Sequence, residues 1–140
     1  MEAETIIENL ALSPHPEGGW YRQTWAADGP GRPAGTCIYY LLRAGEESRW
    51  HRIDSAEIWH FYAGEPLRLW IAPGLEGPAE AFVLGPDIAA GQRPQIIVPP
   101  RHWQAAAPTG AFTLAGCTVS PGFSFDHFEM APAGTGIPQR

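Results

Sequence analysis

The stretch from position 49 to position 64 holds the densest group of side chains that could do chemistry. It reads Arg-Trp-His-Arg-Ile-Asp-Ser-Ala-Glu-Ile-Trp-His-Phe-Tyr-Ala-Gly. If residues 48–53 and 57–63 are strands, a short turn between them brings His51 and Glu57 side by side. An imidazole next to a carboxylate suits a general base or half of a metal site. We therefore predict that His51 and Glu57 are the catalytic pair.

Alternation along these two strands predicts which other side chains share the face of this pair. The residues with the same strand parity are Arg49, Ile53, Trp59 and Phe61. His60 has the opposite parity, so we expect it to point away from Glu57, toward the other face of the sheet or an interface.

The elements that must hold this pair are short strands. Of the 140 residues, 16 are glycine and 15 are proline, and they separate aromatic or β-branched runs at residues 20–25, 36–43, 48–53, 57–63, 67–72, 81–84, 95–98, 103–107 and 112–119. Helical spacing of apolar residues occurs at residues 4–12. This pattern predicts an all-β sandwich or barrel after a short N-terminal α-helix. We expect one domain over residues 1–140, with the barrel at 15–130 and a loose tail at 131–140.

The composition excludes several kinds of function. The chain has no lysine, which removes Schiff-base chemistry and the phosphate-loop lysine. Its formal net charge is −6 and its arginines do not cluster, so a nucleic-acid partner is not expected. No apolar run approaches the length of a membrane span. Cys37 and Cys117 lie far apart in apolar runs, which indicates free thiols and a cytoplasmic location.

The spacing around the catalytic pair resembles the first motif of the cupin superfamily. That motif runs histidine, one residue, histidine, three or four residues, glutamate, six residues, glycine. His51, Glu57 and Gly64 match its first histidine, its glutamate and its glycine. Ile53 stands where the second histidine would be. The resemblance therefore implies a cupin site with a changed set of ligands.

The second cupin motif resembles residues 99–104, Pro-Pro-Arg-His-Trp-Gln. Gln104 occupies the place of a histidine ligand, so the resemblance implies that it faces the same cavity as His51 and Glu57. A divalent metal could bind to these three side chains. An amide oxygen is a weak ligand for zinc or iron, however, and we expect neither a tightly held metal nor another cofactor.

Three longer segments extend the resemblance to one branch of the superfamily. They are residues 15–22 (His-Pro-Glu-Gly-Gly-Trp-Tyr-Arg), residues 55–64 and residues 116–129. Together they resemble a cupin branch known only as a domain of unknown function. The resemblance implies a cupin double-stranded β-helix, the RmlC-like jelly-roll barrel. It also implies a small-molecule pocket in the barrel interior and a homodimer.

The ligand-binding residues that we predict are Arg22, Tyr21, Arg49, Trp59, Phe61 and Gln104. Arg22 and Arg49 could clamp a phosphate or carboxylate of the ligand, or form salt bridges at the surface. Tyr21 offers a phenol acid or a stacking surface.

The remaining histidines are not assigned to the site. His15 lies between two prolines and His127 lies near the tail, so we expect both to be surface or packing residues. His102 shares strand parity with Gln104 but follows Pro-Pro-Arg, which predicts a turn, so both an inward and a solvent-exposed position stay open.

These residues lead to three functional hypotheses. The first is a metal-free enzyme similar to the epimerases and isomerases of the superfamily, in which His51, oriented by Glu57, abstracts a proton and a tyrosine returns one. The second is a binding or sensing module that holds a small polar or anionic metabolite, sugar- or nucleotide-like, without changing it. The third is a metal-dependent enzyme of the oxygenase type.

Overall fold

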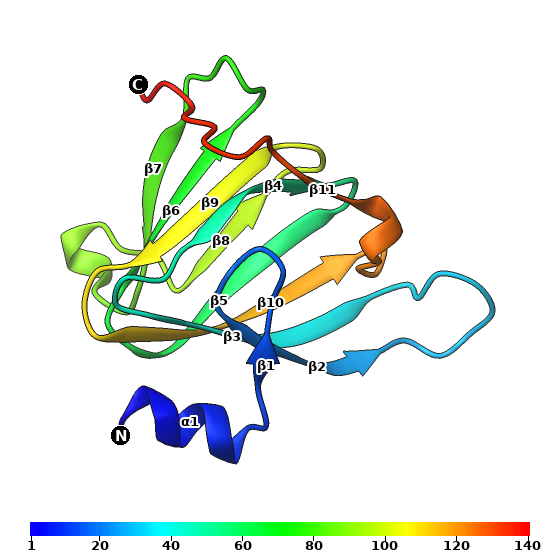
Figure 1. The fold of residues 1–140 in the computed structure, drawn as a ribbon, viewed down its shortest axis with the longest axis horizontal. Helices are drawn as coiled ribbons and strands as arrows, with labels where there is room; N and C mark the ends of the chain where they lie inside the picture. Colours follow the sequence, from blue (N-terminus) through cyan, green and yellow to red (C-terminus); the bar gives the residue numbers. More distant parts are fainter.

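Two antiparallel sheets packed face to face build the fold. The computed structural model describes residues 1–140. Its elements in chain order are α1 (Ala3–Asn9), β1 (Ser13–Pro14), β2 (Trp20–Ala26), β3 (Thr36–Arg43), β4 (Ser48–Ile53), β5 (Ala56–Gly64), β6 (Leu67–Ala72), β7 (Glu80–Leu84), η1 (Ile88–Ala90), β8 (Gln95–Val98), β9 (Trp103–Pro108), β10 (Phe112–Ser120), η2 (Phe125–His127) and β11 (Phe128–Met130). One sheet has the strand order β1-β2-β3-β10-β5-β8 and the other β11-β4-β9-β6-β7. Figure 1 shows the two layers, with the N-terminus at the lower left and the C-terminus at the upper left.

The predicted strands all form, each within one residue of its expected ends. This agreement arises because each run alternates in polarity and ends at glycine or proline. The pattern does not predict β1 and β11, which have 2 and 3 residues and are too short to show an alternation. The all-β architecture with a short leading helix is therefore confirmed.

The main hydrophobic core fills the space between the sheets. Leu42 and Val98 come from the six-stranded sheet, Leu69 and Leu84 come from the five-stranded sheet, and none is more than 1% exposed. The core occupies the half of the barrel toward the ends of β3 and β5. The other half, at the starts of these strands, holds polar side chains instead.

Helix α1 covers part of the outer face of the six-stranded sheet. Ala3 and Ile6 of the helix and Leu12 after it pack against Leu41 of β3 in a second, smaller core cluster. The helix ends at Asn9, earlier than the predicted residue 12. No helix of this chain has the length and apolar character needed to span a membrane.

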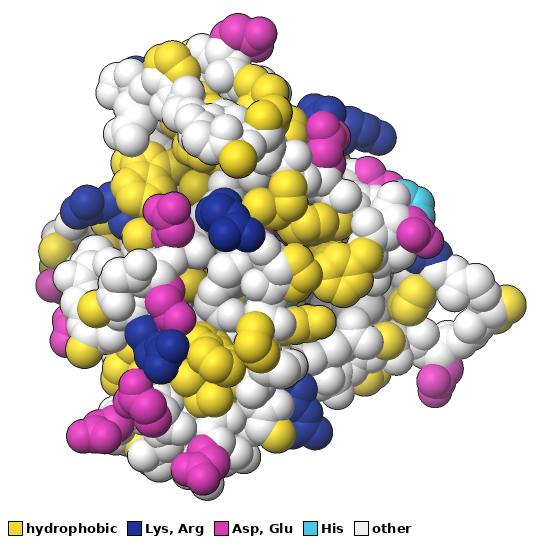
Figure 2. All heavy atoms as spheres, in the orientation of Figure 1, with side chains coloured by type: hydrophobic (Ala, Val, Ile, Leu, Met, Phe, Trp, Pro, Cys, Tyr) yellow, Lys and Arg dark blue, Asp and Glu magenta, His cyan; other side chains and the backbone are white.

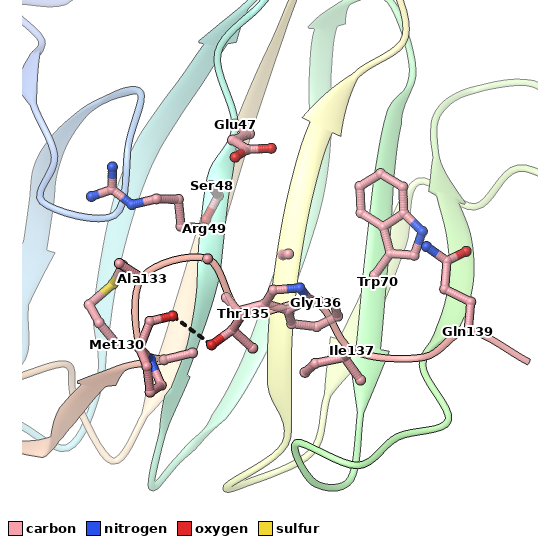
Figure 3. A pocket seen from close by; sticks show the side chains of 15 residues that line it. Glu47, Ser48, Arg49, Trp70, Met130, Ala133, Thr135, Gly136, Ile137 and Gln139 are labelled. Atoms are coloured by element: carbon pink, nitrogen blue, oxygen red, sulfur yellow. Dashed lines mark hydrogen bonds between the residues drawn. The ribbon is translucent and has the colours of Figure 1, made fainter.

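The C-terminal tail is packed on the barrel, which corrects the prediction of a loose segment at 131–140. Ile137 is buried against Ala72, Ala79 and Trp103. The backbone N–H of Ala79 donates to the carbonyl of Pro138 at 2.7 Å, and the N–H of Arg140 donates to the carbonyl of Ala79 at 3.0 Å. Figure 3 shows the tail arching across the outer face of the five-stranded sheet. One apolar side chain and two backbone hydrogen bonds contribute to this docking, and a Pro- and Gly-rich composition indicates neither.

Charged side chains of both signs are mixed over the visible surface. Figure 2 shows arginines and acidic residues alternating around the rim of this face, while hydrophobic side chains gather toward its middle. Arg52 and Arg43 each pair with an acidic partner, at 2.9 Å to Glu129 and 3.0 Å to Glu46. This face presents no concentrated patch of positive charge.

Candidate functional site

A cavity of about 220 Å³ opens between the two sheets at the polar end of the barrel. Its walls come from β2, β3, β4, β5, β10, the loop before β2 and the segment after β10. The lining residues are His15, Glu17, Tyr21, Gln23, Thr36, Ile38, His51, Ile53, Glu57, Cys117, Val119, Phe123 and Phe125. This volume is below the range of about 300–1,000 Å³ typical of drug-sized ligands, so the cavity suits a small metabolite.

The loop between β1 and β2 brings two ionisable side chains into this cavity. The backbone N–H of His15 donates to the carbonyl of Gly19 at 3.0 Å, and the N–H of Arg49 donates to the carbonyl of Glu17 at 2.9 Å. Gly18 has a φ of 115°, and a Cβ at this position would collide with the carbonyl oxygen of Glu47. Glycine is required here because the loop passes directly over the start of β4.

Glu17 is the centre of a buried polar cluster. The hydroxyl of Ser48 donates to its Oε2, which lies 3.5 Å from Nε2 of His51. Its other oxygen, Oε1, lies 3.3 Å from Nδ1 of His15. Burial raises the pKa of Glu17 to about 7, although the hydrogen bond from Ser48 opposes the shift. The carboxyl therefore exchanges its proton near neutral pH.

The hydrogen bonds of His51 determine which nitrogen carries its proton. Nδ1 lies 2.7 Å from the carbonyl oxygen of Arg49, which can only accept, so Nδ1 is the protonated nitrogen. Nε2 then presents a lone pair toward Glu17 in the neutral ring. Burial lowers the pKa of His51, which keeps the ring neutral. Phe128 stacks on this imidazole at 5.4 Å between ring centroids.

His15 also presents a lone pair to Glu17. The backbone N–H of Glu17 donates to Nδ1 of His15 at 3.1 Å, so the neutral ring carries its proton on Nε2. Burial, followed by the nearby His51, lowers the pKa of His15 to about 4. Two imidazole lone pairs facing one carboxyl favour its protonated form, which agrees with the raised pKa of Glu17.

The position of His15 corrects the prediction of a surface or packing residue. It is only 8% exposed and lines the cavity, with its ring 4.4 Å from that of Tyr21. Sequence reasoning missed Glu17 as a site residue altogether. The only available signal was the segment at residues 15–22, which carried the family resemblance but gave no indication of where its side chains point.

A chain of hydrogen bonds links Glu57 to the core. The indole N–H of Trp59 donates to Oε1 of Gln104 at 2.8 Å, and Nε2 of Gln104 donates to Oε1 of Glu57 at 2.8 Å. The indole can only donate, so it fixes the amide with its oxygen toward Trp59. Burial raises the pKa of Glu57, while the charge of His51 would lower it.

This orientation of Gln104 does not fit a metal on His51, Glu57 and Gln104. The amide oxygen that would bind the cation is directed to Trp59, and the amide nitrogen is directed to Glu57. An N–H donor repels a cation at the point where a cupin histidine would bind it. No group of three or more His, Cys, Asp or Glu side chains is arranged to hold a metal ion.

Aromatic rings surround the mouth of the cavity. Phe123 and Phe125 lie 4.8 Å apart, and each lies within 5.8 Å of Phe128. The segment that carries them is held by Arg32, whose Nε donates to the carbonyl of Gly122 at 2.8 Å. These rings give the polar cavity an apolar rim.

The two predicted arginine clamps lie outside the cavity. Arg22 extends along the outer surface and donates to the carbonyl of Leu10 at 3.3 Å. Arg49 is exposed, because the pairing of β4 with β9 shifts register between Ser48 and His51. This irregularity turns both Ser48 and His51 inward, so the predicted shared face of Arg49 and His51 is wrong.

Three other predicted ligand residues occupy different depths. Tyr21 lines the cavity. Trp59 is 1% exposed and packs against Tyr40 in the main core, so only its indole N–H reaches the site, through Gln104. Phe61 is partly buried and packs against that core farther along the same strand than Glu57. The expected common face of β5 is therefore observed, but only its first residue borders the cavity.

The remaining histidines lie away from the cavity. His60 is on the outer face of the sheet, with Nε2 3.0 Å from Oγ1 of Thr118. His102 has Nδ1 3.2 Å from the carbonyl oxygen of Pro100 and faces a shallow surface depression. His127 is exposed in η2.

A second hollow of about 690 Å³ lies beneath the C-terminal tail, on the outer face of β4, β6 and β9. Figure 3 shows Trp70 and Ile137 beside it, with Glu47 and Arg49 at one end. This hollow has no cluster of buried ionisable groups. The small cavity inside the barrel is therefore the candidate site.

The two antiparallel sheets, with a polar cavity between them at one end, define a jelly-roll barrel of the cupin type. The chain belongs to the cupin superfamily, in the family described as DUF985, whose pattern matches residues 4–131. This membership confirms the resemblance seen in the sequence. No curated protein matches the chain.

Solved structures agree with this assignment. Protein SO0799 from Shewanella oneidensis is 41% identical, with a TM-score of 0.88 over 94% of this chain and 85% of that one. A hypothetical protein from Leishmania major is 28% identical, with a TM-score of 0.87 over 96% of this chain and 90% of that one. Oxalate decarboxylase from Bacillus subtilis is 13% identical, with a TM-score of 0.65 over 84% of this chain and 29% of that one, and shares the fold alone.

Proposed function

We propose that the chain is a metal-free enzyme that moves a proton on a small polar metabolite, as isomerases and epimerases do. The observation that carries this proposal is the contact of 3.5 Å between the unprotonated Nε2 of His51 and the carboxyl of Glu17. A general acid or base works best when its pKa is near the working pH. The pKa of Glu17, raised by burial to about 7, meets that requirement.

The roles in this proposal differ from those expected from the sequence. His51 and Glu17 form the proton-transfer pair, with Nδ1 of His51 anchored on a backbone carbonyl. Glu57 borders the cavity as a hydrogen-bond acceptor held by Gln104. His15, whose protonated Nε2 is the nitrogen not bound to the loop, supplies a donor for a hydroxyl or carbonyl oxygen of the ligand.

The size and lining of the cavity support a ligand of about monosaccharide size. A volume of about 220 Å³ leaves no room for a whole sugar nucleotide. No arginine lines the cavity, so a phosphate or carboxylate group would be buried there without a cationic partner. We therefore propose an uncharged or cationic ligand, whereas the sequence led us to expect a polar or anionic metabolite.

Solvent hydrogen exchange tests the proposed reaction. The protein is incubated in D₂O with a panel of aldoses, ketoses and amino sugars, and deuterium entering carbon positions is followed by NMR. We expect exchange of at least one compound to fall by about 10²-fold or more in His51→Gln and Glu17→Gln. The control His60→Gln removes a histidine from the outer face and should leave the rate unchanged.

The same experiment separates the enzyme from the binding module. A compound that binds the wild-type protein, detected by calorimetry, but exchanges no faster than in buffer alone would favour binding without turnover. Loss of affinity in His51→Gln would then report a ligand contact rather than a catalytic role.

We further propose that the chain forms a homodimer through the outer face of the six-stranded sheet. Directly paired residues form a row across this face without a single charge: Trp25, Cys37, Thr118, Ile58 and Ile97. Trp25 and Ile97 are 56% and 62% exposed in one copy. A second copy would bury this apolar row. Light scattering of Ile97→Glu should then report a monomer, whereas an unchanged mass would contradict this interface.

A further inference from the structure

We infer that the ligand of the barrel cavity carries a protonated amine, placed between Glu57 and the aromatic rim. This inference rests on the proposed function because it names the substrate class of the same site. It assigns the cavity to small amines and amino sugars in preference to neutral or anionic compounds of the same size.

The charge of the cavity favours a cation. The side chains around it include two carboxyl groups, Glu17 and Glu57, and no arginine. Its two imidazoles, His15 and His51, are held neutral by burial, which lowers the pKa of both. Any charge that develops in the cavity at neutral pH is therefore negative, and it attracts a cation.

Glu57 has only one strong hydrogen-bond donor in the protein. This residue is only 8% exposed. Its Oε1 accepts from the amide of Gln104, and the other hydrogen bond to this carboxyl comes from the thiol of Cys117, which is a weak donor. A buried carboxylate is stabilised when both oxygens have donors. An ammonium group supplies a strong second donor and the missing positive charge together.

The aromatic lining of the cavity also favours a cation. Tyr21, Phe123 and Phe125 contribute rings to the same cavity as Glu57. An ammonium group near aromatic faces gains a cation–π attraction, which strengthens where water is excluded. A phosphate or carboxylate would instead meet the negative faces of these rings. The carboxyl groups and the aromatic rings of the cavity thus both favour a cationic ligand.

Binding of a cation also changes the proton-transfer pair. A positive charge close to Glu17 and Glu57 favours their ionised forms and so lowers the pKa of both carboxyls. Amine binding should therefore release a proton to solvent near neutral pH, because the pKa of Glu17 is raised by burial to about 7 in the free protein. The ligand would convert Glu17 from an acid to a base on arrival.

Calorimetry with matched probes tests this inference. D-Glucosamine is compared with D-glucose, and ethanolamine with ethylene glycol, at pH 6.5 in two buffers of different ionisation enthalpy. We expect each amine to bind at least tenfold more tightly than its hydroxyl partner, with proton release. The advantage should disappear in Glu57→Gln and persist in Glu76→Gln, which removes an exposed carboxyl far from the cavity.

The possible failures have distinct meanings. If neither amine binds more tightly than its hydroxyl partner, or if no proton is released, the amine assignment is wrong, whether or not Glu57→Gln folds. If the amines bind with proton release but no compound exchanges deuterium, the amine assignment stands and the proposed enzymatic reaction fails.

Discussion

Nε2 of His51 lies 3.5 Å from Oε2 of Glu17, and the two residues come from different parts of the fold. Glu17 arrives from the loop before β2, and His51 from the middle of β4. Their contact is enclosed by Ser48, which donates to the same carboxyl oxygen. A proton between these groups is shielded from bulk water, because both side chains are buried.

Replacing Glu17 should change how stability depends on pH. Its pKa is raised by burial from 4.5 to about 7, so the folded state binds a proton that the unfolded state has released. The stability from this group is present below pH 4.5 and is lost as the pH rises toward 7. The difference between the two pKa values corresponds to about 3 kcal/mol in the free energy of unfolding. The titratable or charged groups around it are His15, Tyr40, Arg49, His51 and Glu57.

The measurement compares wild type with Glu17→Gln by urea unfolding between pH 4 and pH 8. His15 acts in the opposite direction, because its pKa is lowered by burial to about 4 and its stability contribution grows as the pH rises toward 6.5. Both proteins retain His15, so the change of their difference with pH reports Glu17 together with the imidazoles in contact with it. The free energy of unfolding of wild type should fall relative to the variant as the pH rises, and a constant difference would contradict the prediction.

The hydrogen bonds of Gln104 should matter for stability. Gln104→Leu removes the partner of the Trp59 indole and the donor to Glu57, both of which are buried. Leaving two buried groups without partners should lower the free energy of unfolding by about 2 to 5 kcal/mol, measured by chemical unfolding. The matched control Gln139→Leu alters an exposed side chain and should change stability by about 0.5 kcal/mol or less. Similar values for the two variants would show that the chain of hydrogen bonds contributes little.

Arg32 should control the order of the aromatic rim. Its guanidinium donates to both carboxylate oxygens of Asp54, at 2.9 and 2.7 Å, and to the carbonyl of Gly122. The same hydrogen bonds lower the pKa of Asp54. Arg32→Ala should release the segment that carries Phe123, which amide hydrogen exchange over residues 120–126 would report as faster exchange.

The control for this variant is Arg140→Ala, whose guanidinium lies 3.6 Å from Glu80 at the surface. It should leave exchange of the rim unchanged. Equal protection of residues 120–126 in Arg32→Ala and wild type would mean that packing alone, and not the guanidinium, holds the rim.

The docking of the C-terminal tail depends on one side chain. Ile137→Ala should cost about 2 kcal/mol and increase the exposure of Trp103, because it empties the site between Trp103 and Ala79. Ile88→Ala makes the same chemical change at a residue that is 61% exposed. Unfolding followed by tryptophan fluorescence should distinguish the two variants. If Ile137→Ala lowers the free energy of unfolding as little as Ile88→Ala does, the tail is held by its backbone alone.

The sequence by itself determined the strands and the fold class. Alternating polarity and the punctuating glycines and prolines are local signals, because each strand buries one face wherever its partner lies. For the same reason, the placement of His51 and Glu57 on a common cavity could be predicted from two neighbouring strands joined by a short turn.

Only the tertiary structure decided the membership of the site. His15 and Glu17 reach the cavity because a loop with Gly18 at positive φ crosses the start of β4, a contact that no local pattern encodes. Arg49 points away from the cavity because the register of β4 against β9 shifts, and this shift depends on the partner strand. Gln104, which was expected to face the cavity, is fully buried behind Glu57 and donates its amide N–H to that residue, because Trp59 from the other sheet donates to its oxygen. Alternation is a property of one strand, whereas each of these positions is set by a contact between distant segments.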